Sequence, residues 1–207
     1  LDGKTALDDG TSQWITSEAA RTDGHAWRAR ACAVLTGIGT VLEDNPRLDV
    51  RLVDTPRQPV RVLVDSRLQV PLDAHILGAK SPLYIYAAVQ DDAKKTALEA
   101  LGATVIHLPD TRGKVDLAAM LLDLGARQIN ELHVEAGAKL NGSLIRAGLV
   151  DEFLVYLAPK LIGAGRGMAE FGPLAALSEA TPLSFESTTL VGPDLRILAR
   201  IPGRDAF

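Results

Sequence analysis

A carboxylate and a helix start follow one another closely in residues 131–152. The apolar run 132–134 predicts a strand that ends at Glu135, and a helical pattern begins after Gly137. A carboxylate at the end of an apolar strand is costly unless it is paired, so Glu135 either contacts a ligand or pairs with an internal arginine. The unpaired N–H groups of the helix start suit a phosphate, to which Lys139 and Ser143 could add a charge and a hydroxyl. An ordinary strand-to-helix turn is an equally good interpretation, since the spacing is not GxGxxG.

A second group of this kind is Asp65-Ser66-Arg67, which follows another apolar run. An acid at the end of a strand can hold the ribose of a dinucleotide. The hydroxyl and the guanidinium that follow it suit a 2′-phosphate, which favours NADP. Taken alone, the tripeptide is more often a solvated turn.

The remaining reactive side chains give weaker signals. His133 is interpreted as a packed strand residue, and His25, His75 and His107 show no ligand spacing, so no metal site is predicted. Cys32 reads as a small buried apolar group. Residues 163–167 form a glycine-rich loop that could cradle a phosphate, although a simple loop is the better interpretation.

These groups need a scaffold, and the apolar runs predict an α/β domain with a largely parallel sheet. Strands are expected at residues 31–36, 59–65, 83–89, 103–108 and 130–135. Helices are expected from Ser17, as N-cap, to about Arg30, at 91–101 with Asp91 or Asp92 as N-cap, at 115–124 closed by Gly125, and after Gly137.

The end of the chain has a different pattern. Strands at 152–158, 183–190 and 195–201 have little helix between them, and the turn 191–194 joins the last two into an antiparallel hairpin. Because ligands bind beyond the carboxyl ends of strands in open α/β sheets, the exits after Thr36, Asp65, Glu135 and Ala158 are expected to form one rim.

Composition excludes several classes of function. With a net charge of −4 and 4% aromatic residues, the chain has neither the basic surface nor the stacking platforms of a nucleic-acid binder. No apolar run is long enough to span a membrane. A single cysteine excludes a disulfide framework and favours a reducing compartment, here the cytoplasm. Leu1 reads like the tail of a strand, so a truncated first strand is expected.

The order of longer motifs makes a family resemblance specific. The stretches are LDGKTA, DGTSQWIT, LTGIGTVLEDNPRLDVR, VLVDS, VEAGAKLNGSLI, LVDEFLVYLAPKLIG and VGPDLRI. Together they resemble, nearly end to end, the reductase domain of the bacterial bifunctional riboflavin-biosynthesis deaminase–reductase. The resemblance implies a single domain over residues 1–207 with a dihydrofolate reductase-like three-layer fold: helices flank a central, mostly parallel mixed sheet with an antiparallel C-terminal hairpin. It also implies NADPH-dependent reduction of 5-amino-6-(5-phosphoribosylamino)uracil to its ribitylamino form, and a homodimer.

The resemblance also assigns roles to residues. The implied substrate contacts are Ser12, Arg28, Leu48, Arg51 and Glu135, with Arg28 and Arg51 holding the substrate phosphate. The implied cofactor contacts are Trp14, Thr40, Asp44, Ser66 and the phosphate loop Gly137, Ala138, Lys139, Leu140, Asn141, Gly142 and Ser143. Lys4 matches a basic position facing the substrate. The proton donor is left open among Lys4, Glu135 and water.

This sequence departs from the family pattern in two ways. Gly137 is followed by Ala138 rather than by the common proline, which still lets the backbone present its amides. The deaminase half, with its zinc-binding cysteines, is absent, although such a domain could precede Leu1 in the native chain. The alternatives are a dihydrofolate reductase-like oxidoreductase for the undeaminated pyrimidine or another substrate, and a non-catalytic nucleotide-binding module.

Overall fold

The computed structural model describes residues 1–204, so the last three residues of the predicted domain lie outside the described part. By its internal contacts the chain divides into two units. One unit comprises residues 25–137, and the other comprises residues 1–24 together with residues from 138 onward. Helix α1 (Glu18–Arg30) contributes to both.

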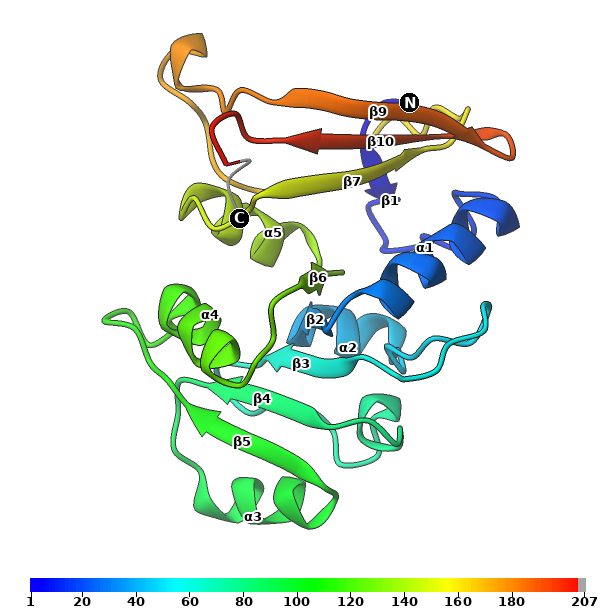
Figure 1. The fold of residues 1–207 in the computed structure, drawn as a ribbon. Helices are drawn as coiled ribbons and strands as arrows, with labels where there is room; N and C mark the ends of the chain where they lie inside the picture. The colour runs from blue at the N-terminus through cyan, green and yellow to red at the C-terminus, as the bar shows by residue number, and fades with distance from the viewer. Residues whose placement is uncertain (205–207) are drawn as a thin grey trace. The chain divides into compact units, whose positions relative to one another are not determined.

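The unit of residues 25–137 contains a five-stranded parallel sheet (Figure 1). Its strand order is β5 (Ala103–His107), β4 (Leu83–Ala87), β3 (Val60–Val64), β2 (Ala33–Gly37) and β6 (Leu132–Val134). The connections include α2 (Ile38–Asp44), the short 3₁₀ turn η1 (His75–Leu77), α3 (Asp92–Ala100) and α4 (Leu117–Ala126). The predicted parallel strands are thus present, each within a few residues of its expected bounds.

Local capping explains where these helices start. The Asp91 side chain accepts a hydrogen bond from the Lys94 amide, and the Asp116 side chain accepts one from the Ala119 amide. The prediction that Gly125 closes α4 is wrong, because Gly125 lies inside the helix. The left-handed position that glycine usually takes is occupied instead by Gln128, with φ 66°.

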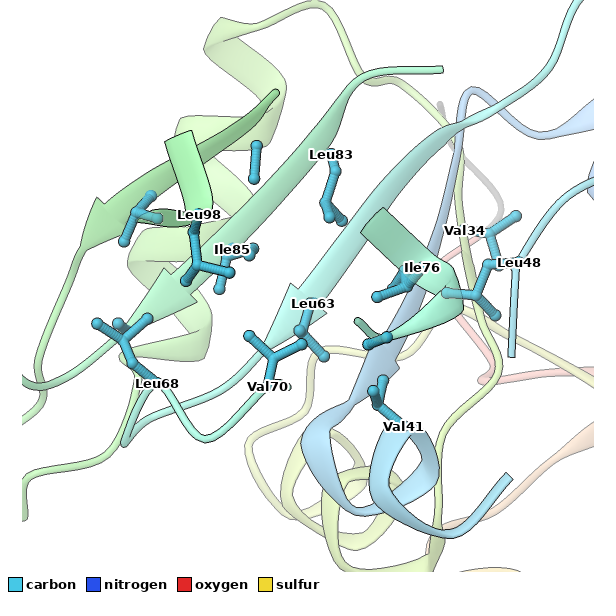
Figure 2. Close-up of a cluster of buried hydrophobic side chains, with 14 residues drawn as sticks. Val34, Val41, Leu48, Leu63, Leu68, Val70, Ile76, Leu83, Ile85 and Leu98 are labelled. Carbon is cyan, nitrogen blue, oxygen red and sulfur yellow. The ribbon is translucent and has the colours of Figure 1, made fainter. Parts of the chain in front are cut away.

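An aliphatic cluster fills one side of this sheet. It joins strand side chains such as Leu63 and Ile85 to Val41, Leu48, Ile76 and others from the connections, as Figure 2 shows. Several of these side chains are fully buried. A packed cluster of this kind fixes the ends of β2 and β3, from which predicted site residues emerge.

The other unit is mainly antiparallel. Strands β7 (Glu152–Leu157), β10 (Asp194–Arg200) and β9 (Ser184–Val191) form a three-stranded sheet in that order (Figure 1). Gly192, with φ 59°, lies in the turn of the predicted β9–β10 hairpin. Strands β1 (Lys4–Ala6) and β8 (Arg166–Gly167) form a small pair. The 3₁₀ turn η2 (Leu177–Glu179) and α5 (Ala138–Arg146) complete the unit.

Two aspartates hold the first half of α1 within this unit. Asp194 accepts hydrogen bonds from the backbone and hydroxyl of Ser17, at 2.7 and 2.6 Å. The Ser17 hydroxyl in turn accepts from the Ala20 amide, as expected for the predicted N-cap. Asp23 accepts from the Tyr156 hydroxyl at 2.5 Å and forms an ion pair with Arg196 at 3.0 Å. One face of the three-stranded sheet is therefore held to α1.

The strand exits only partly match the predicted rim. The exits after Thr36, Asp65 and Glu135 leave β2, β3 and β6 of the parallel sheet. The fourth, after Ala158, follows β7, which pairs with β10 rather than with a strand of that sheet. Leu1, expected as the tail of a strand, lies outside β1, which begins at Lys4.

Candidate active site

An ion pair between Glu135 and Arg28 lies just beyond the carboxyl end of β6. Arg28 Nε and Nη2 donate to Glu135 Oε1 and Oε2, both at 2.5 Å. This bidentate geometry is the strong form of a charge-assisted hydrogen bond. The side chains are 14% and 29% exposed, so the pair is largely shielded from water. Of the two interpretations of Glu135, pairing with an internal arginine is the one that the structure contains.

This pairing decides the charge of Glu135. Burial raises the pKa of the carboxyl, but hydrogen bonds from Arg28 and His133 outweigh it and lower the pKa from 4.5 to about 2. Glu135 is therefore a carboxylate at neutral pH. An ionised carboxyl has no proton to give, which disfavours Glu135 among the predicted proton donors.

Two neighbours of Glu135 were missed as site residues in the sequence. His133 Nε2 lies 3.3 Å from Glu135 Oε1, and the Thr36 hydroxyl donates to the Glu135 carbonyl at 2.7 Å. Positions 133 and 135 are two residues apart, and alternate residues of a strand share a face. That spacing was a signal that could have placed His133 beside the carboxylate. His133 contacts Glu135 rather than only packing in its strand.

The segment of residues 48–51 lies against the same arginine. Arg28 Nη1 donates to the Asp49 carbonyl at 2.9 Å. Leu48 is only 2% exposed and belongs to the aliphatic cluster, while its backbone has a positive φ of 53°. Its predicted substrate contact therefore stays a prediction. Arg51 is 54% exposed and pairs with Asp49 at 2.9 Å, so its guanidinium reaches the surface.

His25 is a further residue that the sequence did not single out. Its side chain is 5% exposed, and its Nδ1 accepts a hydrogen bond from the Arg51 amide at 3.2 Å. His25 and Arg28 are three residues apart on α1 and therefore lie on one face of the helix. The sequence does not reveal this hydrogen bond, because the bond joins a helix to a loop about 25 residues away.

The three residues after β3 that were predicted to contact a dinucleotide have different surroundings in the structure. Asp65 is fully buried and its Oδ2 accepts from the Val70 amide at 2.8 Å, so it holds a turn rather than a ribose. The Ser66 hydroxyl accepts from the Val115 amide at 3.2 Å and keeps its own proton for another acceptor. Arg67 is exposed. The turn interpretation thus holds for Asp65, whereas Ser66 and Arg67 remain able to donate.

Helix α2 carries two more predicted cofactor residues, of which Thr40 lies near Gly137. A β-carbon added to Gly137 would lie 3.8 Å from the Thr40 hydroxyl, which is ordinary contact distance. Thr40 is half-buried, and Asp44 is exposed at the end of α2. Residues Arg28, Thr40, Glu135 and Gly137 are thus collected around the ends of β2 and β6.

In the other unit, several residues of the predicted phosphate loop make contacts with neighbouring parts of the protein. The Asn141 side chain donates to the Met168 carbonyl at 3.0 Å, and the Ser143 hydroxyl donates to the Lys139 carbonyl of its own helix at 2.9 Å. Gly142 is buried against the Glu170 backbone. The first-turn amides of Ala138, Lys139 and Leu140 have no intrahelical acceptors, as at every helix start.

The predicted residues near the N-terminus belong to this unit as well. Lys4 is half-buried in β1 and Ser12 is half-buried in the following segment. Trp14 is 62% exposed, with the Arg21 guanidinium 4.3 Å from its ring centre. The Lys160 ammonium donates to the Trp14 carbonyl at 3.1 Å. The glycine-rich segment 163–167 is tied down by Asp2, which accepts from the Gly163 amide, so the simple-loop interpretation is favoured.

A cavity of about 480 Å³ is lined by segments that precede β3 and β4 of the parallel sheet. Gln58 and Ser81 are among its lining residues, as is Asp49, whose carbonyl accepts a hydrogen bond from Arg28. In residues 1–204 no three His, Cys, Asp or Glu side chains gather to hold a metal ion. Within the same residues, no helix has the length and apolar character needed to cross a membrane.

A chain that combines a parallel α/β unit, with a paired carboxylate at its strand exits, and a unit containing an antiparallel hairpin has the dihydrofolate reductase-like architecture that the motifs predicted. The chain belongs to the RibD C-terminal domain family, whose model matches residues 1–197. Both the expected family and the expected fold class are confirmed.

Individual relatives agree with this membership. The riboflavin biosynthesis protein RibD of Bacillus amyloliquefaciens is 39% identical over 96% of this chain and 54% of its own length. A protein of Buchnera aphidicola named 5-amino-6-(5-phosphoribosylamino)uracil reductase is 30% identical over 92% of this chain and 96% of its own. The structure of Acinetobacter baumannii RibD superposes with a TM-score of 0.84 at 31% identity, covering 97% of this chain and 55% of that one. The chain thus spans about half the length of the RibD proteins that it matches.

Proposed function

We propose that this chain reduces 5-amino-6-(5-phosphoribosylamino)uracil to 5-amino-6-(5-phosphoribitylamino)uracil, with NADPH as the reductant. The observation that carries the proposal is the match to the Buchnera aphidicola reductase, which extends over nearly the whole of both chains. The RibD relatives, which are named for riboflavin biosynthesis, support the same activity. The proposed substrate is already deaminated, so a deaminase must act before this step.

The residues around Arg28 suggest how substrate would be held. Arg51 is the proposed ligand of the substrate phosphate, because its guanidinium is at the surface and a phosphate accepts paired N–H donors. Arg28 is less suited to a phosphate, since three of its five N–H groups are used and the Glu135 carboxylate would repel the anion. Its proposed task is to orient Glu135.

Glu135 is proposed to act as an acceptor and not as an acid. Its carboxylate is ionised and fixed by Arg28, so it can accept a hydrogen bond from a ribose hydroxyl and hold the sugar in one orientation. Ser12 and Leu48 are the other proposed substrate contacts. Since Glu135 has no proton to give, Lys4 and water remain as proposed sources of the proton that the reduction consumes.

The donor groups in this chain fit a dinucleotide phosphate. The proposed contacts are Thr40, Asp44, Ser66, the residues Gly137–Ser143 and the exposed ring of Trp14. Gly137 is exposed, and the first-turn amides of α5, Lys139, the Ser66 hydroxyl and Arg67 are all donors suited to an anion. NADPH, when bound, supplies the hydride that reduces C1′ of the opened sugar. Binding and orienting the substrate and the cofactor are the proposed tasks of the protein's own residues.

One assay tests the proposed activity. NADPH oxidation is followed by absorbance with the deaminated ribosylaminouracil phosphate, with its undeaminated analogue and with dihydrofolate as separate substrates. Oxidation with the deaminated compound alone is expected. Oxidation with the undeaminated compound instead would reverse the order of reduction and deamination. NADPH binding without oxidation of any substrate would favour the non-catalytic nucleotide-binding module.

A homodimer is proposed on the basis of an apolar sheet face. Residues paired across antiparallel strands share a face. Phe153, Val155 and Leu157 of β7 are paired with Ala199, Ile197 and Leu195 of β10, which are paired in turn with Phe185, Thr188 and Leu190 of β9. Phe185 and Leu190 are each 72% exposed. Exposed apolar side chains on one sheet face are typical of a protein interface, and a second copy of the same face would cover them.

Light scattering after gel filtration tests this proposal. The purified chain is expected to have twice the mass of one chain, and Phe185→Glu with Leu190→Glu is expected to yield the mass of one chain. Thr104→Glu, on an exposed position of β5, is the matched control and should leave the mass unchanged. A monomeric parent chain would rule the dimer out.

A further inference from the structure

The segment of residues 48–51 lacks regular secondary structure, yet its backbone is fixed by three side chains. Arg28 Nη1 donates to the Asp49 carbonyl at 2.9 Å. Gln58 both accepts from the Val50 amide, at 2.7 Å, and donates to the Val50 carbonyl, at 2.9 Å. His25 Nδ1 accepts from the Arg51 amide at 3.2 Å. Side chains therefore supply the pairing that a strand partner would otherwise supply.

His25 is suited to this task by its burial and its tautomer. His25 is 5% exposed, so its ring has little contact with bulk water. Burial, reinforced by the charges of Arg28 and Arg51, lowers the pKa of His25 to about 4. The imidazole is thus neutral at neutral pH, and because Nδ1 is an acceptor, the ring proton lies on Nε2.

We propose that His25 is a positioning residue, which holds the Arg51 backbone so that the Arg51 side chain is directed at the substrate phosphate. The inference rests on the proposed function for the identity of the anion, but the tether itself does not. Among residues 1–204 the Arg51 side chain pairs with Asp49 alone and is 54% exposed, so its direction depends on the backbone from which it projects. The His25 bond sets that backbone from the same helix face that carries Arg28 and, through it, Glu135.

Two substitutions of His25 separate the tether from simple packing. His25→Leu fills similar space without an acceptor, whereas His25→Asn places an amide oxygen near the position of Nδ1. His25→Leu is expected to raise the KM for the phosphorylated substrate about tenfold, as the loss of one hydrogen bond allows. The KM for NADPH and kcat are expected to change little. His25→Asn should recover most of the loss.

A second readout does not depend on turnover. Amide hydrogen exchange of residues 46–53 is expected to quicken in His25→Leu and to return toward the parent rate in His25→Asn. His107→Leu is the matched control, because His107 is an exposed histidine of β5. The control should alter neither the KM nor the exchange of this segment.

The outcomes are distinguishable. A selective rise in substrate KM, with faster exchange and rescue by asparagine, supports the positioning role. An unchanged exchange rate in His25→Leu overturns it. A rise in both KM values together with a fall in kcat and a lower unfolding midpoint overturns it as well. If the parent chain oxidises no NADPH with any substrate, the proposed function fails, while the exchange experiment still decides whether His25 holds the segment.

Discussion

Two arginines that the motifs placed on one substrate group have different surroundings. Arg28 is 14% exposed and donates through Nε and Nη2 to Glu135, whereas Arg51 is 54% exposed and its side chain pairs with Asp49. Removing each arginine should therefore change the free energy of unfolding by a different amount. A shielded pair leaves an uncompensated charge when one partner is removed, and an exposed pair does not.

The arginine substitutions should separate stability from affinity. Arg28→Ala is expected to lower the free energy of unfolding by about 2 kcal/mol, because it leaves the largely buried Glu135 carboxylate without its arginine partner. Arg51→Ala should change it by less than about 0.5 kcal/mol and raise the KM for the phosphorylated substrate about 10–100-fold. Urea unfolding and steady-state kinetics check the two effects. Equal destabilisation by both changes would contradict the difference in burial.

Glu135→Gln removes the charge while keeping the shape of the side chain. The substitution is expected to lower kcat/KM about 10–100-fold, since an ionised acceptor is replaced by an amide that cannot accept from both Arg28 nitrogens. Glu131→Gln is a matched control, because Glu131 pairs with Arg30 at an exposed position. Turnover and substrate KM equal to those of the parent chain would exclude the acceptor role for Glu135.

At the scale of elements, α5 is shaped by the chain segment that crosses it. The Glu170 amide donates to the Ala138 carbonyl at 2.8 Å, and Asn141 donates to the Met168 carbonyl. A β-carbon added to Gly142 would lie 1.9 Å from the Glu170 carbonyl oxygen. Gly142 is thus needed for the close approach of two backbones, in addition to any role in phosphate binding.

Two helical glycines should respond to alanine with opposite signs. Gly142→Ala is expected to destabilise the protein by about 2 kcal/mol or more, because backbone must move away from the new methyl group. Gly125→Ala in α4, where the added carbon meets nothing within 4 Å, should stabilise it by about 0.5 kcal/mol through helix propensity. Urea unfolding midpoints measure both. A Gly142→Ala protein as stable as the parent would mean that this packing is loose.

At the scale of the whole molecule, His25 and Glu135 make stability depend on pH in two windows. The folded pKa of His25 is lowered from 6.5 to about 4, so between these values only the unfolded chain takes up the proton and stability falls as the pH falls. The carboxyl pKa of Glu135 is lowered from 4.5 to about 2. Its contribution is present above pH 4.5 and is lost as the pH falls toward 2.

The upper window can be tested by removing one group. Between pH 6.5 and 4 the His25 contribution amounts to about 3 kcal/mol of unfolding free energy. His25→Leu is expected to flatten the pH dependence over this range in urea unfolding, while His107→Leu should keep the parent profile. A profile of His25→Leu that falls as steeply as that of the parent would show that other groups cause the acid loss.

The sequence by itself determined the features that depend on neighbours in the chain. Continuous apolar runs predict the parallel strands, Ser17 and Asp91 predict helix starts, and residues 191–194 predict the hairpin turn. Each of these is a matter of propensity or of a hydrogen bond spanning a few residues. The ordered motifs also sufficed to predict the family and fold class. The prediction that Gly125 ends α4 was wrong because Gln128 adopts the left-handed conformation after the helix.

Only the tertiary structure decided which side chains meet. Arg28 and Glu135 are 107 residues apart and come together because β2 and β6 are neighbours in one sheet. The link between His25 and Arg51, the inward side chain of Leu48 and the close approach at Gly142 depend likewise on packing between distant segments. Hydrophobic periodicity specifies which face of an element is buried, but not which polar group will stand opposite it. That pairing is set by strand order and register, which the whole core determines together.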